Sequence, residues 1–373
     1  MGSQQDMTIQ QQTSKAAPVE FKQVTKVYGR DVTAVDQVSL KVEAGELITL
    51  LGPSGCGKTT TLRMIAGLEM ATTGQILIGD SDVTKLPATE RDVSMVFQSY
   101  ALFPHMSVLE NVSYGLRIGK MKKAEIVERT ERGLEIVGLT GYGDRLPSEL
   151  SGGQQQRVAV ARALVLEPQV LLFDEPLSNL DAKLRRQVRE DIRDIQTKLG
   201  LTVVYVTHDQ EEALAVSDRI IVMNNAKIAQ IGTPRELYDA PVDEFVADFI
   251  GEANLFDGVI NAVEGDIATA SVNGISFTAA ARELSIGPAR IAIRPGRVRL
   301  SPAGATNTMP GKVAKATYAG SHMEYKVTTD ATELFVVSDV ESGFSEGEAV
   351  SVGFAEKGPV LLPGASISKA ISN

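Results

Sequence analysis

The segment Gly52–Thr59 constrains the fold more than any other part of this chain, because it places a lysine and a threonine behind a glycine-rich turn. It reads GPSGCGKT and fits the pattern G-x-x-x-x-G-K-[ST], in which main-chain N–H groups surround a phosphate. An apolar run, Leu47–Leu51, precedes it, and a helical pattern, Thr60–Leu68, follows it. A strand, this turn and a helix in that order predict an α/β fold with a phosphate site at the turn.

The residues of this loop have different expected roles. The glycines let the main chain approach the β-phosphate, Lys58 supplies a cation between the β- and γ-phosphates, and the Thr59 hydroxyl is placed to bind Mg²⁺. We interpret Cys56 as a small filler residue, and the alternative is a thiol whose modification blocks nucleotide entry. The whole set expected at the phosphates is Gly52, Pro53, Ser54, Gly55, Cys56, Gly57, Lys58, Thr59 and Thr60.

Composition narrows the class of protein. The chain has 373 residues, a formal net charge of −10, one cysteine and three histidines. The length suits two or three domains, and the negative charge argues against nucleic-acid binding. A single cysteine excludes an intrachain disulfide and fits a reducing compartment. Apolar runs fall short of the roughly 18 residues that a membrane span needs, and we expect a disordered polar tail over residues 1–17.

Hydrophobic patterns predict an α/β domain over residues 18–240, with a mostly parallel sheet covered by helices. Its strand-like runs are Glu46–Leu51, Val93–Phe97, Val170–Phe173, Thr202–Val206 and Arg219–Met223. Residues 99–164 are helical by periodicity and interrupt this series, so we expect an inserted helical subdomain there.

The pattern changes near residue 241. We expect a linker helix over residues 241–253, capped by Asp243 and closed by Gly251. Residues 254–373 contain short alternating runs separated by glycines, which predict a small antiparallel barrel or sandwich that could hold two similar halves. Examples of these runs are Gly258–Ala262, Ala289–Ile293 and Tyr325–Thr328.

Polar residues that suit phosphoryl transfer follow three of the apolar runs. Asp174 and Glu175 end one run, where an aspartate can bind Mg²⁺ and a glutamate can polarise the attacking water. Gln98 ends another and could carry its amide to the metal or its water. His208 follows a third, at the edge where α/β sheets bind ligands, and could hydrogen-bond the γ-phosphate.

A second phosphate-binding pattern lies at Leu150–Gln154, which reads LSGGQ and opens the helical run Arg157–Leu164. It places two glycines and a serine at a helix N-terminus, where unpaired N–H groups and the helix dipole favour an anion. One nucleotide rarely needs two such sites from one subunit. We therefore expect two copies of the chain to share each nucleotide.

Together and in this order, these motifs resemble the nucleotide-binding subunits of ATP-binding cassette (ABC) transporters over roughly residues 18–240. In this resemblance Tyr28 matches the aromatic residue that stacks on adenine, and Ser178–Asp181 matches the D-loop. The family implies ATP and Mg²⁺ as cofactors and a homodimer that encloses two ATP molecules head to tail. Metal ligands would be Thr59, Gln98 and Asp174, catalytic residues Lys58, Glu175 and His208, and further nucleotide contacts Ser151, Gly152, Gly153, Gln154 and Asp181.

Three classes within this family differ in their sequences. Exporter halves carry fused transmembrane helices, which we do not find, and cytosolic ABC proteins of translation control usually contain two cassettes. We therefore expect an importer ATPase at the cytoplasmic face of the inner membrane, with two separate permease subunits and, indirectly, a solute-binding protein. The apolar stretch Gln98–Met106 lies where this family receives a coupling helix, and it can also serve as subdomain core. A non-transport cytosolic ATPase remains the alternative.

The region from about Phe256 onward resembles the oligonucleotide-binding-like (TOBE) barrel of importer ATPases for carbohydrates, polyamines, ferric iron and phosphonates. Ile293–Val298 matches a landmark of this barrel, except that Gly296 stands where the family commonly has glutamate. The resemblance favours ferric iron as the solute, with a polyamine, 2-aminoethylphosphonate or a sugar as alternatives. Four arginines in this region, Arg290, Arg294, Arg297 and Arg299, have two interpretations. They could form an anion-sensing patch, or they could lie on solvated strand faces and in dimer contacts.

Overall fold

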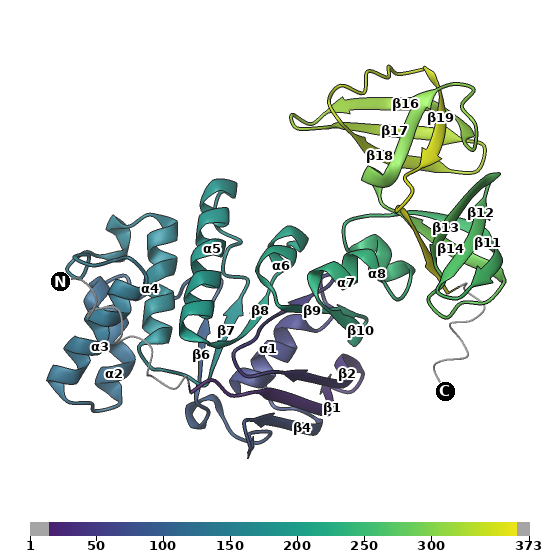
Figure 1. Ribbon diagram of the computed structural model, residues 1–373. Helices are drawn as coiled ribbons and strands as arrows, with labels where there is room; N and C mark the ends of the chain where they lie inside the picture. The colour runs from purple at the N-terminus through teal and green to yellow at the C-terminus, as the bar shows by residue number, and fades with distance from the viewer. Residues whose placement is uncertain (1–14, 364–373) are drawn as a thin grey trace, which may run out of the picture. The chain divides into compact units, whose positions relative to one another are not determined.

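The structure, a computed structural model, describes residues 15–363, so the predicted disordered tail lies outside the described residues except for 15–17. Two compact units make up the chain, Met1–Pro234 and Arg235–Asn373 (Figure 1). Within residues 15–363, every helix falls short of the length and apolar character that a membrane span requires.

The first unit contains a six-stranded sheet in the order β10-β9-β3-β8-β7-β6. Strands β9 to β6 are parallel to their neighbours, and β10 pairs antiparallel with β9. The expected mostly parallel sheet is confirmed, and its central strands are buried throughout because helices cover both faces. The strand bounds are β3 (Leu47–Leu51), β6 (Val93–Val96), β7 (Val170–Asp174), β8 (Thr202–Val206), β9 (Arg219–Asn224) and β10 (Lys227–Gly232).

A second, four-stranded antiparallel sheet was not expected from the sequence. Its strand order is β2-β1-β4-β5. Phe21 and Val38 from this sheet share one hydrophobic core with Leu62 of α1 (Lys58–Ala66) and Ile48 of β3. The helix that follows the phosphate loop is therefore packed against both sheets. The strand bounds are β1 (Val19–Tyr28), β2 (Val32–Val42), β4 (Thr73–Ile78) and β5 (Ser81–Asp82).

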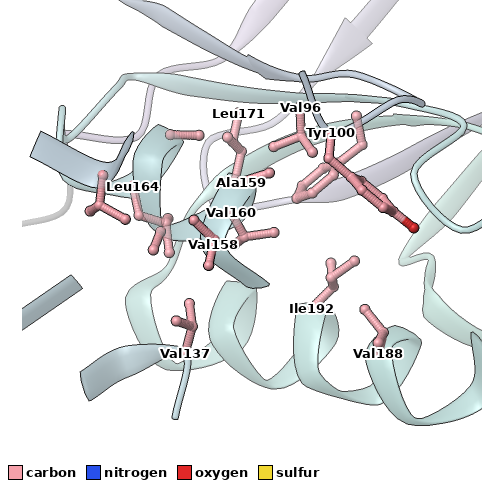
Figure 2. Close-up of a cluster of buried hydrophobic side chains, with 14 of the residues drawn as sticks. Val96, Tyr100, Val137, Val158, Ala159, Val160, Leu164, Leu171, Val188 and Ile192 are labelled. Carbon is pink, nitrogen blue, oxygen red and sulfur yellow. The ribbon is translucent and has the colours of Figure 1, made fainter. Parts of the chain in front are cut away.

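Three helices occupy the region where the sequence predicts helical structure, namely α2 (Val108–Ile118), α3 (Lys123–Ile136) and α4 (Gly152–Leu164). Helices α5 (Ala182–Leu199) and α6 (Gln210–Val216) lie between the later strands along the chain. Figure 2 shows the core where side chains of α4 face α5 and strand β7. Labelled members of this core are Val96, Tyr100, Val158, Val160, Leu171, Val188 and Ile192.

The second unit is mostly β, as expected. Two five-stranded antiparallel sheets, β13-β12-β11-β14-β20 and β15-β19-β16-β17-β18, contribute side chains to a shared hydrophobic core. Strand β20 pairs with β14, and β19 lies between β15 and β16. The bounds are β11 (Asn254–Glu264), β12 (Ile267–Val272), β13 (Ile275–Ala280), β14 (Gly287–Ile293), β15 (Val298–Pro302), β16 (Met309–Tyr318), β17 (Met323–Thr329), β18 (Glu333–Ser338), β19 (Ala349–Phe354) and β20 (Pro359–Leu362).

Two short helices, α7 (Pro234–Asp239) and α8 (Glu244–Phe249), precede these sheets. Asp243 caps α8 as predicted, since its carboxylate accepts the Val246 N–H at 2.8 Å. Apart from Pro234, α7 belongs with the second unit, whereas the sequence prediction extends the first domain to residue 240.

Arg290 of β14 and Arg294, which directly follows β14, bind these two short helices. Arg294 is almost fully buried and donates to the main-chain carbonyls of Ala247, Glu252 and Tyr238. Arg290 pairs with Glu244 at 2.9 Å and with Asp257 at 2.8 Å. For these two residues the contacts favour a structural role over an anion-sensing patch.

Candidate nucleotide site

The parallel strands bring the polar residues that are expected to bind phosphate and metal to one edge of the sheet. Strands β3, β8, β7 and β6 are adjacent and parallel, so their carboxyl ends lie side by side. The phosphate loop follows β3, His208 follows β8, Asp174 ends β7, and Gln98 follows β6. Ligands of open α/β sheets bind at this edge. The fold therefore lines up residues that are up to 156 positions apart in the sequence, from Gly52 to His208.

Two glycines of the phosphate loop are required by close packing. A Cβ on Gly52 would lie 2.3 Å from the carbonyl oxygen of Met223 on β9. A Cβ on Gly57, whose φ is +106°, would lie 2.3 Å from the carbonyl oxygen of Ala34 on β2. The loop therefore fits between β9 and β2 because neither glycine carries a side chain.

The N-terminus of α1 carries the groups that suit a phosphate. No side chain caps the helix at Gly57, so first-turn N–H groups remain available to an anion. The Lys58 side chain is 6% exposed, and its Nζ donates to the carbonyls of Gly52 at 2.7 Å and Pro53 at 2.9 Å. These bonds hold the ammonium inside the loop. Cys56 is buried beneath it, with Sγ 3.8 Å from Lys58 Nζ, as a filler residue would be.

The end of β7 places two carboxylates and an imidazole together. Burial raises the pKa of the Asp174 carboxyl, an effect that nearby Arg63 opposes and Glu175 reinforces. Glu175 Oε2 lies 3.2 Å from Nδ1 of His208, whose side chain is 63% exposed. The backbone of Glu175 is left-handed, with φ +45°, and its N–H donates to the Val206 carbonyl at 3.0 Å. Strained residues of this kind concentrate at functional sites.

Gln98 is tied to the segment that follows β7. Its Nε2 donates to Ser178 Oγ at 3.1 Å, and Asn179 Nδ2 donates to the main-chain carbonyl of Gln98 at 3.0 Å. The Ser178 hydroxyl in turn donates to the Glu175 carbonyl at 3.1 Å. Sequence reasoning named Ser178 and Asn179 only as part of a matched segment. The structure adds that Ser178 joins Gln98 to Glu175 and that Asn179 binds the main chain of Gln98.

A buried network that sequence reasoning missed supports His208. Glu212 of α6 is 4% exposed and accepts hydrogen bonds from the Tyr205 hydroxyl and, at 2.7 Å, from Thr207 Oγ1. The same Thr207 oxygen accepts the Asp209 N–H at 3.0 Å. Burial raises the pKa of Glu212, although the two hydroxyl donors act against this rise. The bonds therefore fix the residues on both sides of His208.

Tyr28 stands at the end of β1, in the hairpin that β1 forms with β2. Tyr28 is 36% exposed, and the hairpin passes beside the phosphate loop where Ala34 approaches Gly57. The Nζ of Lys26 lies 4.7 Å from the centroid of the Tyr28 ring. The aromatic ring predicted to stack on adenine is thus on the same side of the unit as the phosphate loop.

Ser151 begins α4, and the predicted helix N-terminus at this motif is confirmed. Ser151 Oγ accepts the Gln154 N–H at 3.3 Å, and Gln154 Oε1 accepts the Ser151 N–H at 2.9 Å. A Cβ on Gly153 would lie 2.7 Å from Leu184 Cδ1, so this glycine permits close packing of α4 on α5. Within residues 15–363, no hydrogen bond or ion pair joins Ser151–Gln154 to the phosphate loop.

Asp181 has a local partner as well. Its carboxylate accepts the N–H groups of Lys183 at 3.1 Å and Leu184 at 3.0 Å, which makes it the N-cap of α5. The geometry therefore assigns Asp181 a capping role first, and the nucleotide contact implied by the family resemblance stays a prediction.

Comparisons with known proteins agree with this geometry. Residues 35–178 match the family model described as ABC transporter, and residues 291–362 match the TOBE domain. The Fe(3+) ions import ATP-binding protein FbpC of Rhizobium etli is 57% identical, over 94% of this chain and 99% of its own length. Its counterpart from Vibrio cholerae is 46% identical, over 92% of this chain and 97% of its own length.

Two solved structures resemble the first unit. A dimeric post-hydrolysis state of an ATP-binding cassette bound to ADP and Pi is 34% identical, with a TM-score of 0.52, and the match covers 58% of this chain and 99% of that chain. The cbiO1 protein of Clostridium perfringens, part of an ABC transporter complex, is 28% identical, with a TM-score of 0.56 and coverage of 59% and 89%. The phosphate loop, the carboxylates of β7 and relatives this similar over nearly its full length show that the chain belongs to the ABC transporter family, as an importer-type ATPase with a C-terminal TOBE domain.

Proposed function

We propose that this ATPase energises the uptake of ferric iron. The observation that carries the proposal is the 57% identity, over 94% of the chain, with a Rhizobium etli protein named for Fe(3+) import. The choice of iron over a polyamine, 2-aminoethylphosphonate or a sugar rests on these relatives.

ATP would bind across the edge of the six-stranded sheet. Lys58 and the first-turn N–H groups of α1 would hold the β- and γ-phosphates, and Tyr28 would stack on the adenine. Glu175 would accept the proton of the attacking water, while His208, 3.2 Å from its carboxylate, would orient that carboxylate and contact the γ-phosphate. The hydrogen bonds of Thr207 and Asp209 fix the residues on either side of His208, which would hold its main chain in place for this task.

The donor set at the same edge fits Mg²⁺. Thr59 offers a hydroxyl, Asp174 a carboxylate and Gln98 an amide oxygen, which are hard oxygen ligands of the kind that Mg²⁺ prefers. The bond from Gln98 Nε2 to Ser178 leaves the amide oxygen available to a metal ion or its water. When bound, the metal would neutralise charge on the β- and γ-phosphate oxygens.

A second copy of the chain would complete each site. The N-terminus of α4 would offer an anion the N–H groups of Gly152 and Gly153, because the capping box takes up the N–H groups of Ser151 and Gln154. In a head-to-tail homodimer it would meet the γ-phosphate held by the other copy. The dimeric cassette structure that resembles the first unit supports this arrangement.

The chain would act at the cytoplasmic face of the inner membrane, bound to two permease subunits that receive iron from a solute-binding protein. On either side of Gln98–Met106, the stretch expected to receive a coupling helix, Phe97 is 39% exposed and Leu109 is 37% exposed. The ring of Phe103 packs on Tyr114, with centroids 4.6 Å apart. Exposed apolar side chains in this part of the chain would suit the docking of an amphipathic helix from a permease.

The test is complementation of a Rhizobium etli strain that lacks its own Fe(3+) import ATP-binding protein. We expect this chain to restore uptake of radiolabelled ferric iron, and the same chain carrying Glu175→Gln to reach the membrane without restoring it. Uptake of labelled spermidine, 2-aminoethylphosphonate and maltose is measured in parallel. If the chain sediments with the membranes but ferric iron uptake stays at the level of the deletion strain, iron is the wrong solute.

A further inference from the structure

A lysine lies against the ring that is proposed to stack on the nucleobase. Lys26 precedes Tyr28 by two residues on β1, and its Nζ lies 4.7 Å from the ring centroid. This separation is within the range in which a cation is attracted to the face of an aromatic ring. The Lys26 side chain is only 13% exposed, so water screens this attraction less than at an open surface.

The ammonium is held in this position by the segment that follows α1. Its Nζ donates to the Met70 carbonyl at 2.9 Å and lies 3.0 Å from the Glu69 carboxylate, which is itself 28% exposed. The main chain is joined at the same place, because the Val27 N–H donates to Thr72 Oγ1 at 3.0 Å. Lys26 is therefore fixed by two oxygen partners and cannot leave the ring without breaking both contacts.

We propose that Lys26 is a positioning residue for ATP binding, which holds the Tyr28 ring in the orientation that stacks on the nucleobase. The ammonium lies over the ring, and Tyr28 remains 36% exposed, so part of its surface is open to a planar heteroaromatic ring. A ring fixed before binding loses less conformational freedom when the base arrives. This inference rests on the proposed nucleobase contact of Tyr28.

The expected effect is on binding and not on chemistry. Lys26 holds a group that contacts the base equally in the ground state and in the transition state, so its loss raises KM and leaves kcat unchanged. In the purified full chain, we expect Lys26→Met to raise the KM for ATP about 3- to 10-fold. Lys26→Arg keeps a cation over the ring and restores most of the affinity, and Glu69→Gln gives a smaller rise than Lys26→Met.

Two controls separate a contact with the base from a general defect. Inorganic tripolyphosphate contains no base, so its inhibition constant against ATP hydrolysis stays the same in Lys26→Met. In a Tyr28→Ala background there is no ring to position, so adding Lys26→Met causes no further rise in KM. Glu69→Gln provides the same comparison if Lys26→Met lowers the yield of folded protein.

The outcomes distinguish a failure of the Tyr28 contact with the nucleobase from a failure of the role proposed for Lys26. If Tyr28→Ala leaves the KM for ATP unchanged, the proposed contact of Tyr28 with the nucleobase is wrong. If Tyr28→Ala raises KM but Lys26→Met does not, Tyr28 keeps its role and the inference about Lys26 is overturned. The inference is also overturned if Lys26→Met weakens tripolyphosphate binding, lowers kcat, or raises KM equally in the presence and absence of the Tyr28 ring.

Discussion

At the scale of single residues, Glu175 combines a strained backbone with the side chain that is proposed as the general base. A glutamate in the left-handed region costs on the order of 1 kcal/mol or more relative to an ordinary conformation. Two hydrogen bonds offset this cost, from the Glu175 N–H to Val206 and from the Ser178 hydroxyl to the Glu175 carbonyl. The conformation brings the carboxylate within 3.2 Å of His208, where the proposed reaction would use it.

Glu175→Gln tests whether this carboxylate is the general base. Glutamine keeps the size of the side chain but cannot accept the proton, so we expect ATP binding to persist while turnover falls at least about 100-fold. Phosphate release and the mass of the ATP-bound species measure the two effects, and an ATP-bound dimer should accumulate. Glu211→Gln, on an exposed position of α6, is the matched control with normal turnover. Near-normal hydrolysis by Glu175→Gln would remove Glu175 as the base.

The positions of Lys58 at a helix start and of Asp174 at a strand end were predictable, because their neighbours along the chain define the motif. Glu212 was not, because its role depends on Tyr205 and Thr207 from the adjacent strand end. The sequence does contain a signal, since Asp209 and Glu212 have the spacing of a helix N-cap with a glutamate three residues later. Asp209 does cap α6, but the Glu212 carboxylate turns inward. Local patterns identify the helix start and not the buried partner.

At the scale of elements, the contact between α4 and α5 positions the segment that would meet a second copy's nucleotide. A Cβ on Gly153, at the start of α4, would lie 2.7 Å from Leu184 Cδ1 of α5, so a larger side chain there requires Leu184 to shift. At the other end of α4, Arg162 donates to the carbonyls of Tyr100 and Ala101, two consecutive residues with positive φ. Helix α4 is therefore fixed both to α5 and to the chain that follows Gln98.

Gly153→Val tests the packing at the start of α4. The new Cβ would lie 2.7 Å from Leu184 Cδ1, so either Leu184 or the helix must move. We expect the free energy of unfolding to fall by about 1–3 kcal/mol, measured by urea denaturation. Leu184→Ala in the same chain makes room and should recover part of the loss. Gly296→Ala, in open space, serves as the control. A Gly153→Val chain as stable as the parent would contradict this account of the packing.

The parallel strands were predictable because they are short, apolar and bounded by turns, as buried strands are. The antiparallel sheet was missed for a physical reason. Strand β1 pairs with β2 through three register shifts, and Gln23 within it has φ +49°. These irregularities break the alternation of buried and exposed residues on which a sequence prediction of a strand depends.

At the scale of the whole molecule, the proposed site needs two copies of the chain. Chains carrying Ser151→Arg are mixed with chains carrying Lys58→Ala, and ATPase activity is compared with each variant alone. In the mixed dimer one composite site retains every motif and the other carries both lesions, so the mixture should exceed either variant. Absence of both an activity gain and ATP-dependent association would count against shared sites.

The order of the units was predictable from composition and turn residues, since the helical and parallel patterns end before the glycine-separated runs begin. The boundary between the two units, at Pro234, was harder to predict from the sequence. Helix α7 looks like a continuation of the α/β pattern, but Tyr238 within it accepts a hydrogen bond from Arg294 of the second unit and lies under its guanidinium. A long-range partner therefore decides to which unit α7 belongs.

The strand order of the second unit also governs when each part of the chain can fold during synthesis. Strand β19 lies between β15 and β16, and β20 pairs with β14 at the edge of the other sheet. Neither sheet can therefore be completed until residues 349–362 have left the ribosome. The nucleotide-binding unit ends at Pro234 and can fold while those residues are still being added. A nascent chain could thus hold ATP before its C-terminal β unit is complete.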